Sequence, residues 1–400
     1  MAEEIFEVWA SGPDGTSVLT GRASPIQRRD RTARQLAFEY DGSWLRHGRE
    51  LSPDLPLVSG PAVLPVNRSV PGAFEDAMPD AWGRALVVRE LGRPVEDVEM
   101  LLLGSDETRQ GDLRFRSSEG VWLAEPDGRL PGVKDLAELV DASARFLAGH
   151  EIDPGIKRLI GAGGTAGGAR PKSIVREATG ELAIAKFPRR KDEFDVSAWE
   201  AVAAELSSRA GIETPPWCRV VVGQDQSVFV TRRFDRDSDL RVPYWSFRTL
   251  FGLGTEERPD YAKLARGICL RSTDPAADGE QLLRRAVLNA MINNHDDHMR
   301  NFGVIPAIRG DGLRLAPSFD VNPSIDLDYG TPLVTGGDQA RRDPLTVIPM
   351  AESFRLSAEQ AREIIAEVSD MVAGWRAIAE SLDIDAAEIQ RMRPAFSPIG

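Results

Sequence analysis

The sequence has few cysteines and no long apolar run, and both shortages exclude whole classes of protein. Cys218 and Cys269 are the only cysteines among 400 residues, so neither a disulfide framework nor a cysteine zinc site is expected. No stretch approaches the ~18 consecutive apolar residues that a membrane-spanning helix needs. The first ten residues lack a basic segment followed by an apolar one, as a secretory signal would require. We therefore expect a cytoplasmic protein that does not enter a membrane.

Basic residues are also in short supply, which bears on nucleic-acid binding. The 49 lysines and arginines are outnumbered by 62 acidic residues, and the net charge of −13 repels a phosphate backbone on average. Direct DNA binding by this chain alone is therefore disfavoured, although local basic patches are compatible with that balance. The hydrophobic fraction of 42% and the charged fraction of 28% are typical of a folded protein, and the length allows two or three domains.

The sequence patterns divide the chain into three parts: 1–150, 151–236 and 237–400. The first part is expected to be β-rich, with strands at 5–9 and 34–40, a helix at 82–90 and a closing helix after Gly132. The second contains a glycine-rich segment, two hairpins (173–175 with 182–187, and 220–222 with 228–230) and a helix at 197–210 between them. The third is mainly helical, with a helix over 282–291 and a core-facing helix over 364–378 that follows a capping box at Ser357 and Gln360.

The glycine-rich segment Gly161–Gly168 has five glycines in eight residues. Such a loop can expose successive backbone N–H groups to a phosphate, although a glycine run alone is also typical of a mobile loop. A Walker A motif is excluded, because Pro171 and not glycine precedes Lys172 and Ser173.

Lys186 lies within the apolar run Glu181–Pro188, where a strand would place it on the same face as Leu182 and Ile184. It is either an edge lysine that reaches water or a buried cation that awaits phosphate oxygens. In the second case Glu200 on the following helix is the candidate partner, and Glu205 is the next choice.

The densest polar cluster is Asn293–Asn301, which holds two of the four histidines and the adjacent carboxylates of Asp296 and Asp297. It follows a periodic helix, so we expect it at the end of that helix or in the loop beyond. Further on, Asp320 lies between Phe319 and Val321, and an acid flanked this way on a strand either pairs with another group or binds a cation.

The order of these features matches the needs of phosphoryl transfer. That reaction requires a loop and a lysine for the phosphates, a base near the acceptor hydroxyl, and oxygen ligands for Mg²⁺. In protein kinases the catalytic-loop Asp and Asn are five residues apart, and a further Asp on the next hairpin holds metal. Asp296 and Asn301 have that separation, and Asp320 follows at hairpin distance.

Several stretches resemble the HipA family, the kinase toxins of bacterial type II toxin–antitoxin pairs. The likeness covers most of the chain, and the matching stretches are Phe38–Leu45, Ala77–Arg84, Gly167–Ser173, Glu181–Pro188, Phe229–Arg236, Asn293–Gly303 and Leu315–Ser324. The resemblance implies an α+β, two-lobed protein-kinase-like fold with an added N-terminal β-rich subdomain and a mainly helical C-terminal lobe. It implies serine/threonine kinase activity with ATP and Mg²⁺ as cofactors.

The resemblance also implies roles for single residues. Asp296 would be the catalytic base, Asn301 and Asp320 would hold Mg²⁺, and His298 would lie beside the phosphates. The nucleotide would be bound by Lys186, with Glu200 as its ion-pair partner, by backbone groups at Arg232 and Phe234, and by the glycine-loop residues Gly163, Gly164, Thr165, Gly167 and Gly168. Thr165 stands where family members carry a phosphorylatable hydroxyl, so autophosphorylation there is a hypothesis.

Two neighbours of the proposed base need a separate interpretation. The five-residue spacing to Asn301 favours Asp296 over Asp297, and His295 is expected to be a structural residue of the loop. After Asp320 the sequence continues Val-Asn-Pro, not Phe-Gly, and no Ala-Pro-Glu follows, so a conventional activation loop is not expected.

Three alternative functions stay open. A metal-dependent phosphohydrolase would use the His295–His298 cluster, but would need further ligands that His47 and His150 do not obviously supply. A small-molecule kinase would share the same catalytic groups. A pseudokinase would act only as a corepressor, and the presence of Lys186, Asp296, Asn301 and Asp320 argues against it.

The partners follow from the resemblance as well. It implies a small helix-turn-helix antitoxin (HipB-like) that contacts operator DNA, so that this chain meets DNA only indirectly. It implies a protein substrate, with aminoacyl-tRNA synthetases among the family's known targets, and growth arrest as the outcome.

Overall fold

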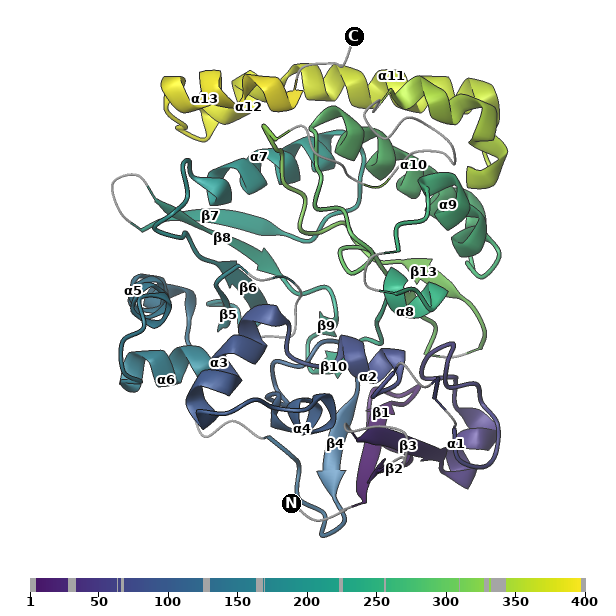
Figure 1. Cartoon of the computed structure of the whole chain (residues 1–400). Coiled ribbons are helices and arrows are strands. Elements are labelled where there is room, and N and C mark those ends of the chain that lie inside the picture. Colours follow the sequence, from purple (N-terminus) through teal and green to yellow (C-terminus); the bar gives the residue numbers. More distant parts are fainter. Residues whose placement is uncertain are drawn as a thin grey trace. The chain divides into compact units, whose positions relative to one another are not determined.

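The computed structural model describes residues 5–27, 34–62, 64–65, 68–124, 130–162, 168, 170–222, 226–254, 257–308, 310–326, 331 and 343–396. The chain forms two compact units, each assembled from separate segments (Figure 1). Unit 1 comprises Met1–Arg190, Arg232–Gly252 and Ile305–Asp311, and unit 2 comprises Lys191–Thr231, Leu253–Val304 and Gly312–Gly400. The three-part division of the chain stays a prediction. In the part of the chain that the structure describes, no helix is both long and apolar enough to cross a membrane.

Unit 1 begins with an antiparallel sheet of strand order β3-β2-β1-β4. Its strands are β1 Phe6–Ser11, β2 Ser17–Ile26, β3 Gln35–Tyr40 and β4 Arg114–Ser117. Aromatic rings pack edge to face behind the sheet: Phe74 contacts Phe38 and Phe115, each with a centroid distance of 5.6 Å, and all three are buried. The predicted strands at 5–9 and 34–40 correspond to β1 and β3 within one or two residues.

Helices follow this sheet in unit 1, and short strands complete it. The helices are α1 Gly42–His47, α2 Gly72–Asp76, α3 Ala81–Leu91, α4 Asp97–Leu103, η1 Val133–Asp135, α5 Leu136–Leu147, α6 Pro154–Gly161 and α8 Phe247–Phe251, and the short strands are β9 Arg236–Asp237, β10 Leu240–Arg241 and β11 Trp245–Ser246. Aspartates begin several of the helices; the carboxylate of Asp80, for example, accepts a hydrogen bond from the Gly83 N–H at 2.7 Å.

The hairpin of β5 (Lys172–Arg176) and β6 (Leu182–Lys186) also lies in unit 1. Gly180 in the turn has a φ of +104°, a conformation that favours glycine, and the predicted hairpin around Thr179 and Gly180 is confirmed. Ile174, Val175, Ala183 and Ala185 are fully buried, so the hairpin is a core element of the unit.

A buried ion pair ties two distant segments of unit 1 together. Arg233 donates to both carboxylate oxygens of Asp235, at 2.8 and 2.6 Å, and also to the carbonyl oxygens of Thr108 and Arg109. Asp235 accepts a further hydrogen bond from the Gly111 N–H at 2.7 Å. The segment that follows β8 is thereby fixed to residues 108–111.

Unit 2 contains helix α7 (Val196–Arg209) and the hairpin of β7 (Trp217–Val221) and β8 (Ser227–Arg232), as the sequence predicted. The C-terminal segment packs against α7. Trp199 of α7 lies 6.0 Å from Trp375 and 5.9 Å from Phe396, measured between ring centroids, and its indole donates to the Glu388 carboxylate at 2.7 Å.

The helical part of unit 2 surrounds α10 (Pro275–Met291), which packs against α9, α11 and η2 (Figure 1). These and the remaining elements are α9 Tyr261–Cys269, β12 Gly303–Pro306 (whose last two residues belong to unit 1), β13 Leu313–Leu315, η2 Pro344–Phe354, α11 Ala358–Ala373, α12 Trp375–Ser381, α13 Ala386–Met392 and η3 Arg393–Phe396. At Gly279 an added Cβ would lie 1.9 Å from the Phe354 carbonyl oxygen, so α10 and η2 approach closely only because this residue has no side chain.

The capping box at Ser357 and Gln360 is confirmed, with both of its hydrogen bonds present. The prediction of one core-facing helix over 364–378 is wrong in one respect, because the helix ends at Ala373 and α12 begins at Trp375. Gly374 stands between them, and glycine weakens a helix interior by about 1 kcal/mol relative to alanine.

Candidate functional site

The glycine-rich segment can be described only at its ends. Gly163, Gly164, Thr165 and Gly167 lie outside the described residues. Gly168 has a φ of +90°, and its carbonyl oxygen accepts a hydrogen bond from the Trp82 N–H at 3.3 Å. The end of this segment is therefore fixed to the start of α3.

Lys186, at the end of β6, has only 7% of its surface exposed. Of the two sequence interpretations, the geometry thus favours the buried cation over an edge lysine that reaches water. The residue directly opposite in the hairpin is a second buried lysine, Lys172, and its ammonium group lies 2.8 Å from the carboxylate of Asp80.

Arg232 and Phe234 lie at the end of β8 and just beyond it, and their side chains are engaged locally. Arg232 pairs with Glu177 at 2.7 Å, and the ring of Phe234 lies 5.8 Å from that of Tyr244. The Arg233 N–H between them donates to the Leu182 carbonyl oxygen at 2.9 Å. Any contact of this segment with the adenine ring of a nucleotide would therefore be made by backbone groups.

Glu200 lies on α7 with 4% of its surface exposed. Its predicted pairing with Lys186 stays a prediction, because the two residues belong to different units. Glu205, the second choice, forms an i,i+4 ion pair with Arg209 at 2.8 Å on the surface of the same helix.

The polar cluster follows α10, as the sequence predicted. The helix ends at Met291, and Asn293 adopts a φ of +53°, the left-handed conformation that asparagine tolerates at a helix end. The Asn293 amide donates to the carbonyl oxygens of Ser324 and Asp326, at 2.7 and 2.5 Å. These bonds hold the chain that follows Asp320 against the start of the cluster.

Asp297, which follows the proposed base, is 2% exposed and is engaged by other parts of unit 2. Its Oδ2 accepts a hydrogen bond from the Tyr261 hydroxyl at 2.6 Å, and its Oδ1 accepts one from the Thr331 N–H at 2.5 Å. The Tyr261 hydroxyl in turn accepts a bond from the Asn289 amide at 2.9 Å. Asp297 thus fixes the loop and offers no open face to a substrate.

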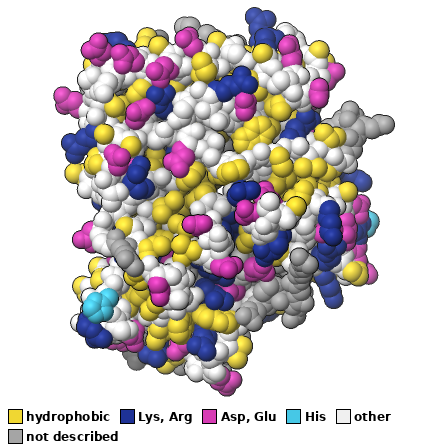
Figure 2. Space-filling view, turned by 180° about the vertical axis from the view of Figure 1, so that it is seen from behind, with side chains coloured by type: hydrophobic (Ala, Val, Ile, Leu, Met, Phe, Trp, Pro, Cys, Tyr) yellow, Lys and Arg dark blue, Asp and Glu magenta, His cyan; other side chains and the backbone are white. Residues whose placement is uncertain are grey.

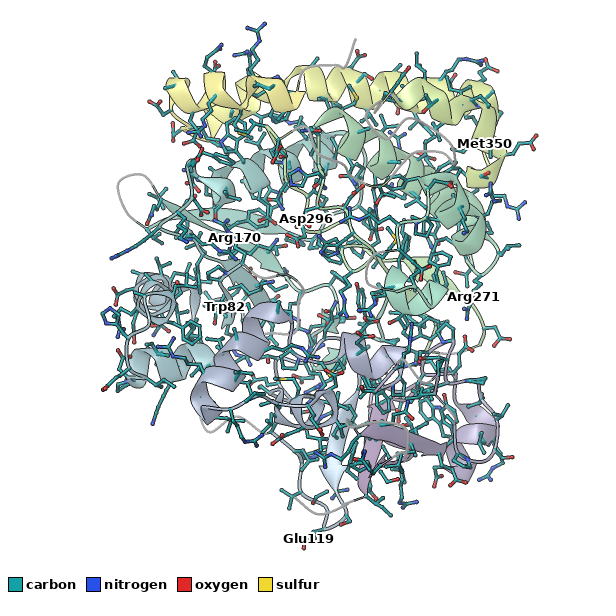
Figure 3. The ribbon with its side chains drawn as sticks, viewed as in Figure 1. Trp82, Glu119, Arg170, Arg271, Asp296 and Met350 are labelled. Atoms are coloured by element: carbon teal, nitrogen blue, oxygen red, sulfur yellow. The ribbon has the colours of Figure 1, made fainter. Side chains whose placement is uncertain are left out.

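Asp296 has the opposite character, because 59% of its side chain is exposed. Its N–H donates to the Asn294 side chain at 3.2 Å, and its carbonyl oxygen accepts from the Asn301 amide at 2.8 Å, so the backbone on both sides of the carboxylate is held. Figure 3 marks the position of Asp296. His298 Nε2 lies 3.8 Å from Asp296 Oδ1.

Asn301 and Asp320 supply the oxygen atoms that could hold a metal. Asn301 is 6% exposed, and its Oδ1 has no hydrogen-bond partner among the described residues, whereas its amide nitrogen is occupied by Asp296. Asp320 lies on irregular chain with a φ of +57°. The expectation that Asp320 lies on a strand is wrong: β13 ends at Leu315, and the left-handed conformation at Asp320 is itself incompatible with a strand.

Partial burial and neighbouring charges shift the pKa of Asp296. Protein atoms displace part of the water around its carboxylate and raise its pKa, and the negative charge of Asp320 raises it further. Electrostatic interactions with His298, His295 and Arg258 act in the opposite direction on the Asp296 pKa and do not cancel the rise. The two aspartates are therefore close enough to interact, as two carboxylates that share a cation would be.

His295 is partly buried, and its carbonyl oxygen accepts a hydrogen bond from Arg258 at 3.4 Å. Within the described ranges no three residues of the types His, Cys, Asp and Glu lie together as metal ligands. The phosphohydrolase alternative therefore gains no support from that part of the chain.

Sequence reasoning missed the groups that hold the loop, namely Tyr261, Asn289, Asn294 and Thr331. Asn294 donates to the side chain of Asn289, which is one helical turn earlier on α10. Two sequence features could have pointed to Asn294 and Asn289: the pair of asparagines before His295, and the position of Asn289 on the buried face of its helix. Tyr261 and Thr331 are more than 30 residues from Asp297, and no sequence feature links them to it.

Comparisons with known proteins agree with this reading of the fold. Two family models match: the HipA-like C-terminal domain over residues 164–375 and the HipA N-terminal domain over residues 20–115. The chain therefore belongs to the HipA family. No curated protein sequence matches it.

The chain also matches solved structures to different degrees. One is HipA of Shewanella oneidensis MR-1, solved with HipB and its operator DNA; it is 16% identical, covers 98% of this chain and 96% of its own, and gives a TM-score of 0.66. Another is the proinflammatory kinase CtkA of Helicobacter pylori, 13% identical over 56% of this chain and 92% of its own, with a TM-score of 0.35. The first likeness confirms the expected α+β fold of the HipA type with a helical C-terminal region.

Proposed function

We propose that this chain is an Mg²⁺- and ATP-dependent protein kinase that transfers the γ-phosphoryl group to a serine or threonine of another protein. The observation that carries the proposal is the arrangement at the end of α10. There the carboxylate of Asp296 is exposed, the amide of Asn301 donates to the Asp296 carbonyl oxygen while its own oxygen has no hydrogen-bond partner among the described residues, and the charge of Asp320 acts on Asp296.

The donor set fits a magnesium ion. Mg²⁺ prefers carboxylate and carbonyl oxygens, and a buried oxygen without a hydrogen-bond partner is costly unless a ligand occupies it. Asn301 Oδ1 is such an atom, and Asp320 supplies the negative charge. When bound, the ion would offset the charge of the nucleotide phosphates. Asn301 and Asp320 would hold it.

Asp296 would act as the base. Its exposed carboxylate can approach an acceptor hydroxyl, orient it by a hydrogen bond and accept its proton as the new phosphate ester forms. Its raised pKa favours that role, because a stronger base takes the proton more readily once it is ionised. His298 would lie beside the phosphates.

Residues of unit 1 would bind the nucleotide, with Glu200 of unit 2 in support. Lys186 would contact its phosphates and Glu200 would pair with Lys186, while backbone groups at Arg232 and Phe234 would contact the adenine. Gly163, Gly164, Thr165, Gly167 and Gly168 would enclose the phosphates, and Thr165 is the proposed site of autophosphorylation. The low exposure of Lys186 supports this assignment over that of a surface lysine that reaches water.

The biological role proposed is that of a toxin in a toxin–antitoxin pair. Its partner would be a helix-turn-helix protein like the HipB that is bound to the Shewanella HipA and to operator DNA. The net charge of −13 supports indirect contact with DNA through that partner, and among the described residues on the face in Figure 2 basic and acidic side chains are interspersed. The substrate would be a cytoplasmic protein, with an aminoacyl-tRNA synthetase as the first candidate.

Kinase activity is tested with the purified full chain, labelled Mg-ATP and a bacterial lysate as the source of acceptor proteins. We expect labelled protein bands that require Mg²⁺ and disappear with Asp296→Asn, and growth arrest on expression of the unmodified chain but not of that variant. Mass spectrometry of the incubated chain checks Thr165. Transfer only to small hydroxyl compounds would replace the protein-kinase proposal by a small-molecule kinase, and no ATP consumption at all would refute both.

A further inference from the structure

Two buried lysines lie side by side in unit 1. Lys172 and Lys186 are direct partners in the antiparallel pair β5–β6, and their exposed fractions are 2% and 7%. Residues directly opposite in such a pair project from the same face of the hairpin, with Cβ atoms roughly 5 Å apart. The hairpin therefore carries two ammonium groups on one buried face, an arrangement that needs compensating negative charge.

Asp80 supplies that charge for Lys172. Its Oδ2 lies 2.8 Å from the Lys172 ammonium group, and its side chain is 4% exposed. Its Oδ1 accepts the hydrogen bond from the Gly83 N–H that caps α3. One carboxylate thus joins the first turn of α3 to the first residue of β5.

Trp82, two residues later, makes two more bonds to the same region. Its backbone N–H donates to the carbonyl oxygen of Gly168, and its indole N–H donates to that of Lys172 at 2.8 Å. The indole is buried and packs edge to face on Phe146, with 5.2 Å between ring centroids (Figure 3). The end of the glycine-rich segment and the start of β5 are therefore both held by the first turn of α3.

We propose that Asp80 and Trp82 are positioning residues of the nucleotide site. Trp82 fixes the end of the glycine-rich segment through its backbone N–H and the start of β5 through its indole, and Asp80 neutralises Lys172 beside Lys186, which would contact the phosphates. The inference rests on the proposed function, which assigns Lys186 and the glycine segment to ATP.

This assignment gives the N-terminal domain a part in nucleotide binding. Asp80 and Trp82 lie in the region matched by the N-terminal family model, whereas Gly168 and Lys172 lie in that of the C-terminal model. All four residues belong to unit 1. The N-terminal domain would thus help to complete the phosphate-binding region.

Asp80→Asn is the principal variant, because asparagine caps a helix as well as aspartate does while removing the charge. Trp82→Phe keeps a ring against Phe146 and removes the indole donor. The matched control is Asp41→Asn, since Asp41 caps α1 through the Ser43 N–H at 2.8 Å and is exposed. Calorimetric titration with Mg-ATP and, separately, with adenosine is the measurement.

We expect Asp80→Asn to weaken ATP binding about tenfold and Trp82→Phe by a smaller factor, with adenosine affinity unchanged in both. Adenosine has no phosphates, so an equal loss for both ligands would reveal a purely structural role and overturn the proposal. Removing both charges with Asp80→Asn and Lys172→Met is expected to return ATP affinity to within about threefold of the unmodified chain.

The outcomes separate this inference from the proposed function. If the unmodified chain binds ATP and Asp80→Asn binds it equally well, the inference is refuted and the kinase proposal stands. If the unmodified chain binds no ATP, the proposed function fails and the inference fails with it. The Asp41→Asn control is expected to bind both ligands as the unmodified chain does.

Discussion

The hydroxyl of Tyr261 lies 2.6 Å from Oδ2 of Asp297 and donates a hydrogen bond to it, while the adjacent Asp296 keeps most of its side chain at the surface. Two consecutive aspartates therefore have opposite environments. The buried carboxylate of Asp297 accepts hydrogen bonds that hold the loop, whereas the exposed carboxylate of Asp296 can approach a substrate. Substitutions at the two positions are expected to have opposite effects on stability and activity.

Asp296→Asn is expected to lower kcat by roughly 10²–10⁴-fold, the usual contribution of a general base. Its thermal stability should be equal to or above that of the unmodified chain at pH 7. Folding raises the pKa of Asp296, so the protonated carboxyl group stabilises the folded state. This contribution to the free energy of unfolding is lost as the pH rises through the raised pKa. Steady-state kinetics and thermal melting measure the two effects.

Asp297→Asn is the matched variant and is expected to lose stability. An amide cannot accept from both the Tyr261 hydroxyl and the Thr331 N–H as the carboxylate does, and an unsatisfied buried group costs about 1–3 kcal/mol. Chemical denaturation measures the loss. A stable but inactive Asp297→Asn together with an active Asp296→Asn would reverse our assignment of the base.

Asp320→Asn and Asn301→Ala are expected to raise the Mg²⁺ concentration that half-saturates activity, because each removes one proposed ligand. Asparagine also tolerates the left-handed backbone at Asp320, so the fold should survive the first substitution. Titration of activity with Mg²⁺ at saturating ATP is the measurement. Asn322→Ala serves as the control, since Asn322 is not a proposed ligand and its amide makes only a long bond of 3.4 Å to Asp320. An unchanged Mg²⁺ requirement in both ligand variants would count against this metal site.

The pH dependence of kcat/KM should report the ionisation of the Asp296 carboxyl group. The base works only when ionised, so activity rises with pH and levels off above its pKa, which is raised above that of an ordinary aspartate by partial burial and by Asp320. Arg258 lowers this pKa, and Arg258→Gln should therefore move the acid limb to higher pH. Arg362→Gln, on the exposed face of α11, should leave it in place. A shift to lower pH in Arg258→Gln would contradict the assignment.

Asp235 is expected to matter for stability and not for chemistry. Burial acts to raise its pKa, but the guanidinium groups of Arg233 and Arg236 outweigh burial and hold the pKa well below the usual range. Its contribution is therefore present above the unfolded aspartate pKa and is lost as the pH falls through the depressed folded value. Asp235→Ala should cost about 3–5 kcal/mol, because it leaves Arg233 buried without its partner. Denaturation at pH 7 tests this, with exposed Asp237→Ala as a control expected to change little.

Local patterns predicted the local structure well. The helix expected at 197–210 is α7 from Val196 to Arg209, and the two hairpins lie within a few residues of their predicted positions. Periodicity, turn residues and caps are encoded within a few positions, so a single sequence contains the needed information. Asp320 was misplaced on a strand because apolar neighbours are compatible with a strand and with a left-handed turn alike.

The sequence could not predict which distant groups meet. Five-residue spacing identified Asp296 and Asn301, yet the Tyr261 hydroxyl and the Thr331 N–H that occupy Asp297 come from separate segments. The ion pair of Asp80 and Lys172 likewise joins residues more than 90 positions apart. Such contacts depend on how whole elements pack, and one sequence without relatives carries no record of that packing.

The indole of Trp199 adjoins Glu200 in the sequence and is enclosed by Trp375, Glu388 and Phe396. Burial raises the pKa of Glu388, although the indole bond opposes the rise. Residues 375–396 therefore pack against α7, the helix that bears Glu200, and hold it in place. A chain shortened before Trp375 would keep every proposed catalytic group but would lose these contacts with α7. An inactive preparation is therefore informative only if its C-terminal segment is intact.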